Sequence, residues 1–330
     1  MTFDLGRREA LALGAATLGA AVSGRGAQAQ AVNRAARIIV GFPAGGSSDV
    51  VARIYAERLR GTYAQQVVVE SRSGAAGRIA VEAVKAADPD GTTLLQTPAS
   101  MLTVQPHIYP REVRYDALTD LIPVSTVVTF PFSLCVPEAH PARDLASFAA
   151  WARAQPNEVP WASPAAGAVP HFMGILMARA LNLRMTHVPY RGAAPALQDV
   201  VGGRLPAFLG VVGEQIPLNN AGVRIIAVSS AQRLAKLPSV ATFAEQGLPA
   251  LTMEEWFGVL LPAGTPAPLV TALHQAIVAA SQNAELRAAL DRMDYAPVVS
   301  AAPQDFAERI RRERQEWGPI VRDSGFQPEG

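Results

Sequence analysis

Cysteine, long apolar runs and an excess of charge are nearly absent from this sequence. Cys135 is the single cysteine, which excludes an intrachain disulfide and a cysteine-based metal site. Only 17% of the residues are charged and the formal net charge is +1, without a basic stripe or an acidic tail. Such a composition argues against a nucleic-acid partner.

Signatures of catalysis are missing as well. The sequence contains no Gly-x-Ser-x-Gly elbow, no His-Glu-x-x-His and no cysteine nucleophile with a matching histidine. The five histidines share no metal-ligand spacing. We therefore expect a protein with no enzymatic activity, no cofactor and no metal, and an exported hydrolase is the disfavoured alternative.

The N-terminus has the pattern of an export signal. Arg7 and Arg8 precede a 13-residue apolar stretch from Ala10 to Val22, and a small-residue cleavage motif ends at Ala29. That stretch is too short for a membrane span, which needs about 20 residues. The paired arginines favour a twin-arginine export signal at residues 1–29 over a Sec signal. We expect a soluble, monomeric periplasmic protein, cleaved near Ala29.

Strand and helix patterns alternate along the rest of the chain. The first series is predicted as strands at 37–40, 66–70 and 92–96 with helices at 48–60 and 79–87. This βαβαβ order implies a parallel sheet. A β-rich run at 121–136, broken by Pro131, is predicted to cross into a second unit.

The second unit and the C-terminal third also contain alternating strand and helix patterns. The predicted strands are 159–163, 185–190, 205–209, 225–229, 256–261 and 297–299, and the predicted helices are 144–154, 170–181, 194–201, 266–281, 284–292 and 303–322. Two α/β units joined by more than one crossing indicate a hinged protein with a ligand cleft. We predict one lobe from 30–128 and 231–330, and a second lobe from 129–230.

One loop of the first unit has the chemistry of an anion site. Gly41 to Asp49 joins a predicted strand to a predicted helix through Gly45 and Gly46. Free N–H groups and the helix dipole at a helix start attract a carboxylate. Most strand–turn–helix junctions bind nothing, so the loop alone does not establish an anion-binding site.

Several blocks of sequence together resemble one protein family. The blocks are Phe42-Pro43-Ala44-Gly45-Gly46 with Asp49, Gly74 and Gly77 with Pro89-Asp90-Gly91-Thr92, Ser163-Pro164-Ala165-Ala166-Gly167 with His171-Phe172, Val188-Pro189-Tyr190-Arg191-Gly192-Ala193-Ala194-Pro195-Ala196, Thr242 to Gly247, and Trp256-Phe257-Gly258 with Pro262 to Pro266. In this order they resemble the substrate-binding proteins of tripartite tricarboxylate transporters, also called the Bug family of TctC-like periplasmic solute receptors. The resemblance covers about 38–278.

The resemblance implies a fold, a ligand and partners. It implies an α/β fold of the type II periplasmic-binding-protein kind, with two lobes, a hinge and a cleft that holds a small carboxylate. In the family the first strand–helix loop and a facing loop of the second lobe hold the carboxylate, largely by backbone amides and ordered water. By position these loops are 42–49 and 163–168. Two integral membrane transporter subunits are the partners in the family, though many members are encoded without them.

The candidate ligand-binding residues follow from these two loops and their neighbours. They are Phe42, Ala44, Gly45, Gly46, Ser47, Asp49, Ser163, Ala165, Ala166, Gly167, Ala168, His171, Tyr190 and Arg191. Their individual roles stay open. The Ser47 and Ser163 hydroxyls either contact a carboxylate or serve as a helix cap and a turn residue.

The charged and aromatic candidates have alternatives too. Asp49 is expected to brace its own loop rather than face an anion. Arg191 either pairs with a second carboxylate or forms a structural ion pair. His171 donates to the ligand or to its own loop, and Tyr190 lines the cleft wall or hinge.

Uptake and sensing remain as two biological uses of the same pocket. The leading prediction is a solute-binding protein that supplies a tripartite tricarboxylate-type transporter. A receptor that reports its ligand to a membrane signalling partner would use the same fold and cleft.

Overall fold

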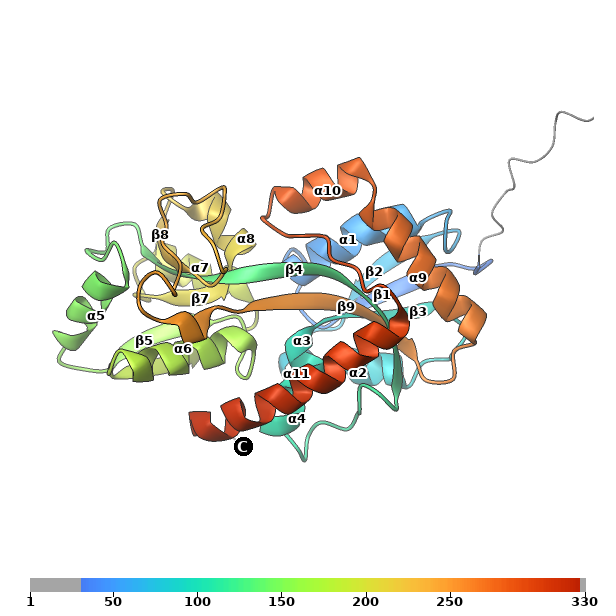
Figure 1. Ribbon diagram of the computed structural model, residues 1–330, viewed down its shortest axis with the longest axis horizontal. Coiled ribbons are helices and arrows are strands. Elements are labelled where there is room, and N and C mark those ends of the chain that lie inside the picture. Colours follow the sequence, from blue (N-terminus) through green and yellow to red (C-terminus); the bar gives the residue numbers. More distant parts are fainter. Residues whose placement is uncertain (1–30, 327–330) are drawn as a thin grey trace, which may run out of the picture.

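A computed structural model describes residues 31–326, and the predicted export signal lies outside the described residues. Within that range the strands follow the order β2-β1-β3-β9-β4-β7-β5-β6, with β8 also paired to β4. Figure 1 shows two groups of elements joined by the long strands β4 and β9. The predicted α/β fold with two lobes is confirmed. No helix in residues 31–326 is both long and apolar enough to cross a membrane.

The first lobe begins with the predicted parallel unit. Strand β1 (Ala36–Val40) pairs with β2 (Val67–Ser71) on one side and β3 (Thr93–Pro98) on the other, both in parallel. Helices α1 (Ser47–Leu59) and α2 (Arg78–Lys85) provide the crossovers. The βαβαβ prediction is therefore confirmed, because the apolar runs and turn residues that define it are local in sequence.

The second lobe repeats this arrangement. It contains α5 (Leu145–Arg153), β5 (Val159–Ser163), α6 (Val169–Ala180), β6 (Met185–Pro189), α7 (Ala193–Val201), β7 (Phe208–Val211), α8 (Val212–Gln215) and β8 (Val223–Val228). Asp144 caps α5 as predicted and accepts a hydrogen bond from the Ser147 N–H. The strand predicted from 205 begins only at Phe208, because β7 takes its register from β4.

Strands β4 (Leu121–Pro137) and β9 (Glu254–Pro262) connect the lobes. Strand β4 pairs with β9 up to Pro131, and from Phe132 onward with β7. The prediction that Pro131 breaks this strand is wrong. Proline lacks the N–H that a central strand donates, and Pro131 stands where β4 changes partners. The predicted lobe boundaries at 128/129 and 230/231 stay a prediction, since β4 contributes to both lobes.

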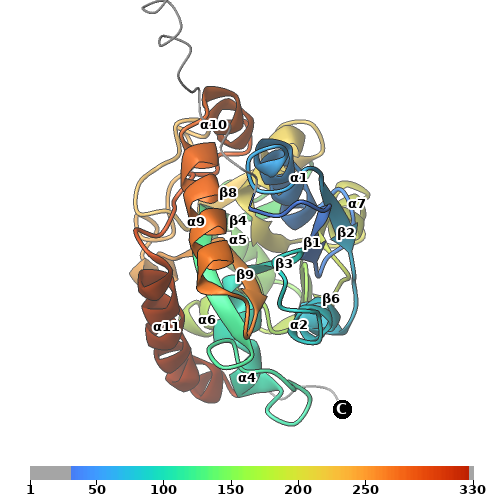
Figure 2. The ribbon, with the colours of Figure 1, turned by 90° about the vertical axis from the view of Figure 1, so that its right-hand side faces the viewer.

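Three helices complete the fold: α9 (Ala267–Ser281), α10 (Ala284–Asp291) and α11 (Pro303–Ser324). In Figure 2, α9 and α11 lie toward the left of the view with α11 below α9, and both helices contact β4. The strand predicted at 297–299 is wrong, since only Ala296 forms an isolated bridge there, with Thr129. The remaining short helices are α3 (Ala99–Thr103), α4 (Gln105–Ile108), η1 (Ala75–Gly77), η2 (Ile216–Leu218) and η3 (Pro249–Leu251).

The largest apolar core extends through both lobes. It contains Val51 of the first lobe, Phe132 of the connecting strand and Trp161 of the second lobe, all nearly or fully buried. Burial of such side chains is the main source of folding free energy. The lobes therefore share one core, which holds the connecting strands between them.

Candidate ligand-binding site

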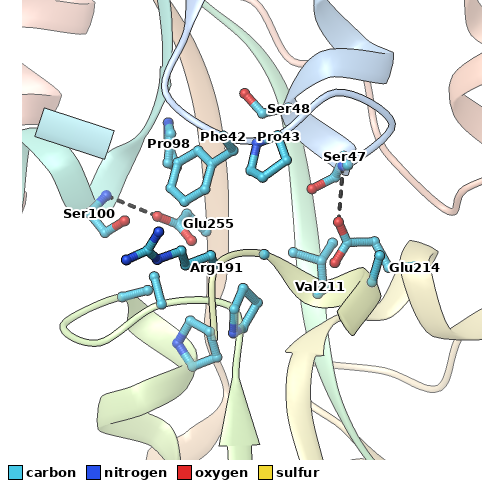
Figure 3. A pocket seen from close by; sticks show the side chains of 18 of the residues that line it. Phe42, Pro43, Ser47, Ser48, Pro98, Ser100, Arg191, Val211, Glu214 and Glu255 are labelled. Carbon is cyan, nitrogen blue, oxygen red and sulfur yellow. Dashed lines mark hydrogen bonds between the residues drawn. The ribbon is translucent and has the colours of Figure 1, made fainter. Parts of the chain in front are cut away.

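A pocket lies between the lobes, and residues of both lobes line it. Lobe one supplies Phe42, Pro43, Ala44, Gly46, Ser47, Ser48, Pro98 and Ser100; β4 and β9 supply Phe130, Phe132, Glu255 and Phe257; lobe two supplies Pro164, Ala165, Ala168, Pro170, Arg191, Gly192, Ala193, Ala194, Pro195, Val211 and Glu214. Figure 3 shows how the labelled side chains surround it. Seven of the predicted site residues lie here: Phe42, Ala44, Gly46, Ser47, Ala165, Ala168 and Arg191.

The first wall is the loop that leads into α1. Gly45 has a φ of 86°, a left-handed conformation that suits glycine, and its N–H donates to Asp49 Oδ2 at 3.0 Å. Arg53 pairs with both oxygens of Asp49 at 2.9 Å. Burial opposes ionisation of Asp49, but Arg53 and the Gly45 N–H hold its pKa below the usual value. Asp49 thus braces its own loop, as expected, and does not line the pocket.

A glutamate from the opposite lobe occupies the start of α1. Oε1 of Glu214 accepts a hydrogen bond from the Ser47 N–H at 2.9 Å (Figure 3). Gly46 is the N-cap and has no side chain to offer, so this carboxyl takes the place of a side-chain cap. Oε2 of Glu214 is buried and has no hydrogen-bond partner in residues 31–326. Burial raises the pKa of Glu214, and the bond from Ser47 opposes that rise.

A second glutamate stands in the same relation to α3. Oε1 of Glu255, on strand β9, accepts from the Ser100 N–H at 2.9 Å (Figure 3). The side chain is only 5% exposed. Burial raises the pKa of Glu255 to about 7, the Ser100 hydrogen bond opposes the rise, and the charge of Glu313 adds to it. Two buried carboxyl groups therefore face one pocket.

The second lobe presents its helix starts to the pocket. Ala193 and Ala194 are the first residues of α7 and line the pocket, so their N–H groups have no partner within the helix. The preceding turn is fixed by a hydrogen bond of 2.8 Å from the Gly192 N–H to the Pro164 carbonyl. A helix start with free N–H groups attracts an anion.

Arg191 is the only cationic side chain among the pocket residues. It lies next to the start of α7 and is exposed. Of the two expected roles, the structural ion pair is not found: no acid in the described part of the chain pairs with Arg191. Its guanidinium is free to receive a carboxylate.

The floor of the pocket is aromatic. Phe130 and Phe132 of β4 and Phe257 of β9 lie below the walls, and the rings of Phe130 and Phe257 are 4.6 Å apart. Phe42 adds a fourth ring from the first loop. These rings give the middle of the pocket an apolar character.

The other seven predicted residues do not line the pocket. They are Gly45, Asp49, Ser163, Ala166, Gly167, His171 and Tyr190. His171 is 3% exposed, and its Nδ1 accepts from the Gly167 N–H at 3.0 Å, so it supports its own loop. Burial lowers the pKa of His171 to about 4.

Ser163 and Tyr190 are likewise engaged with other residues. The Ser163 hydroxyl lies 2.8 Å from Nε2 of His187, whose ring stacks on His171 at 3.8 Å. The Tyr190 hydroxyl donates to Asp199. Neither residue lines the pocket.

Sequence reasoning missed the two glutamates and the aromatic floor. Glu214 and Glu255 meet Ser47 and Ser100 across sequence separations of 167 and 155 residues, which no local pattern reveals. Phe257 belongs to the block that carries the family resemblance, so that block offered a partial signal. Within residues 31–326 no cluster of histidine, cysteine, aspartate and glutamate has the geometry to hold a metal ion.

Comparison with known proteins places this geometry in a family. The sequence model described as "Tripartite tricarboxylate transporter family receptor" matches residues 51–326. Protein BugT of Bordetella pertussis is 33% identical, over 88% of this chain and 90% of its own length.

Two solved structures have the same fold and carry dicarboxylates. "R. palustris Rpa4515 with adipate" superposes with a TM-score of 0.84 at 30% identity, over 90% of this chain and 99% of that one. MatC (Rpa3494) from Rhodopseudomonas palustris, with bound malate, has a TM-score of 0.80 at 27% identity, over 87% and 99%. The family consists of receptors, so the prediction of a protein without enzymatic activity is confirmed. The chain belongs to the receptor family of the tripartite tricarboxylate transporters.

Proposed function

We propose that the protein is a periplasmic solute-binding protein that captures a small carboxylated metabolite between its lobes and delivers it to a tripartite tricarboxylate-type transporter. Two integral membrane subunits are the partners in this proposal. Export would follow from the predicted signal at residues 1–29. The ligands in the structures of Rpa4515 and MatC, adipate and malate, support a carboxylate as the ligand class.

The observation that carries the proposal is the unpaired Arg191 beside the start of α7. A guanidinium binds a carboxylate through two parallel hydrogen bonds. The N–H groups of Ala193 and Ala194 add further donors at the same place. One carboxylate at this position would satisfy the free cation and the free helix start together.

Thermal shift followed by calorimetry against a panel of mono-, di- and tricarboxylates tests the proposal. A ligand that binds only the native state raises the melting temperature, because binding adds to the free energy of unfolding. Arg191→Gln should weaken the best binder by on the order of tenfold or more, since the charge-assisted pair is lost.

The matched control is Arg111→Gln, which changes an exposed arginine that does not line the pocket. It should leave affinity unchanged. The proposal would be wrong if no carboxylate shifts the melting temperature, or if both variants bind as the wild type does.

A further inference from the structure

We infer that the pocket selects acids with one carboxylate and, at the other end, a hydrogen-bond donor such as an amide or ammonium group. Glu214 and Glu255 are the specificity-determining residues. The inference rests on the proposed function, because it names the class of carboxylate that the same pocket takes.

The first step is the balance of charged groups around the pocket. Arg191 is the single cation, whereas Glu214 and Glu255 are two acids. One ligand carboxylate is matched by Arg191. A second carboxylate would enter beside two carboxyl groups, and above about pH 7, where Glu255 is mostly ionised, like charges in a poorly solvated site repel strongly.

The second step is the unused acceptor on Glu214. Its Oε1 is held by the Ser47 N–H, while Oε2 is buried and accepts nothing in residues 31–326. Buried polar atoms in native proteins are nearly always hydrogen-bonded, so an orphan acceptor indicates a missing donor. A carboxylate oxygen accepts hydrogen bonds only, and the group that completes it must carry an N–H or O–H.

Glu255 offers a second acceptor from a separate element, although its Oε2 is not a buried unpaired atom as Oε2 of Glu214 is. It reaches the pocket from strand β9, its Oε1 is held by the Ser100 N–H, and Oε2 accepts no bond from the described residues. The side chain is almost completely buried. Two acceptors, each fixed by one backbone N–H, thus stand on the first-lobe side of the pocket.

These contacts also set the direction of the ligand. The starts of α1 and α3, in the first lobe, are already occupied by the two glutamates. The free helix start and the free cation, α7 and Arg191, belong to the second lobe. The carboxylate therefore lies toward the second lobe, the donor toward the first, and the apolar middle over the ring of Phe130. The expected carboxylate clamp at 42–49 would require displacement of Glu214.

The tyrosine next to Glu214 offers an internal alternative. The Tyr295 hydroxyl is buried without a partner, and its pKa is raised by burial and by the charge of Glu214. A hydrogen bond from Tyr295 to Oε2 would satisfy Glu214 without any ligand. In either case Glu214→Gln removes the charge of Glu214, so the variants below test whether Glu214 acts on the ligand, whichever group completes Oε2.

Three pairs of isosteric probes provide the test: succinate and succinamate, adipate and adipamate, terephthalate and terephthalamate. Each monoamide has the shape of its diacid, replaces one carboxylate with an N–H donor and loses one negative charge. Calorimetry on the full mature protein should show tighter binding of the monoamide, by on the order of tenfold, in at least one pair.

Glu214→Gln and Glu255→Gln keep the shape of each side chain and the acceptor for the backbone N–H. Each should reduce the preference for the monoamide severalfold. The repelling charge is lost, and the NH2 group of glutamine replaces the second carboxylate oxygen, which was the acceptor for the ligand. The control Glu254→Gln changes the neighbouring acid, which is exposed and lies outside this pocket, and should keep the wild-type preference. Circular dichroism shows that the variants are folded.

Each outcome decides one of the two claims. If diacids bind as tightly as the monoamides or more tightly, the inference is overturned and the proposed function stands. An unchanged preference in both Glu214→Gln and Glu255→Gln also overturns it. If no acid of any kind binds, the proposed function is overturned, and the inference with it.

Discussion

At the scale of single residues, Asp49 and Glu214 both hold the loop that leads into α1, one from within the loop and one from the second lobe. The role of Asp49 as a brace follows from a helix start next to glycines, and its contacts with Gly45 and Arg53 lie within four residues. The contact of Glu214 with Ser47 could not be predicted, because no pattern near Glu214 in the sequence indicates it. The acids of the pocket become visible only when the two lobes are brought together.

Glu255 should make the stability of the protein fall as the pH rises. Its native pKa of about 7 lies above the ordinary value of 4.5. Between these values the native state binds more protons than the unfolded state, so the free energy of unfolding decreases with pH. The decrease attributable to Glu255 is on the order of 3 kcal/mol between about pH 4.5 and 7.

Urea unfolding of the wild type and Glu255→Gln across this pH range measures the effect. The difference between the two proteins is the informative quantity, because burial lowers the pKa of His171 and His187 and changes stability in the opposite direction. Glu254→Gln, an exposed change on the same strand, should follow the wild type. Parallel profiles for wild type and Glu255→Gln would show that Glu255 ionises normally.

At the scale of secondary structure, the sequence predicts elements with strong local patterns. Strand β5 was predicted with its observed bounds, and the crossover helices to within a few residues. The short helices α3 and α4 were missed because five and four residues are too few for a periodic pattern. The errors at Pro131 and at 297–299 have a common cause: pairing partners, not propensity, decide whether an extended segment is a strand.

One arginine of the second lobe holds the end of the C-terminal helix α11, in addition to an aromatic contact between Phe172 of α6 and Trp317 of α11. Arg179 of α6 donates to the carbonyls of Asp323 and Ser324, and Figure 1 shows α11 running toward α6. The ring of Phe326 meets His171 edge-on at 4.7 Å. Since His171 supports the loop at Gly167, this attachment connects the end of the chain to a pocket wall.

Arg179→Ala should release the end of α11. Two charge-assisted hydrogen bonds, to the exposed Asp323 carbonyl and the partly buried Ser324 carbonyl, are lost, so the free energy of unfolding should fall by about 1 kcal/mol. Amide exchange measured by mass spectrometry should become faster in residues 320–326. Arg184→Ala is the matched control, because this exposed arginine also donates to two carbonyls, those of Gln155 and Pro156, far from α11. Equal exchange in both variants would contradict the attachment.

At the scale of the whole molecule, the sequence predicts two lobes, but the structure shows what joins them. One continuous apolar core includes Val51, Phe132 and Trp161, and β4 pairs with strands of both lobes. Neither lobe can lose its structure without exposing apolar surface of the other. Cooperative unfolding of the two lobes as one unit is therefore expected.

The single cysteine provides a probe of that cooperativity. Cys135 lies on β4 within the second lobe, is completely buried, and has a thiol whose pKa is raised by burial. A thiol reagent should therefore react only after unfolding. In urea, the midpoint of Cys135 labelling should coincide with the loss of far-ultraviolet circular dichroism, which reports both lobes. An acid present at a free concentration 100 times its Kd should add about 2.7 kcal/mol to the free energy of unfolding. Both midpoints should therefore rise together. Cys135→Ala, which should not label, confirms the assignment, and labelling that precedes the loss of circular dichroism would show that the second lobe unfolds on its own.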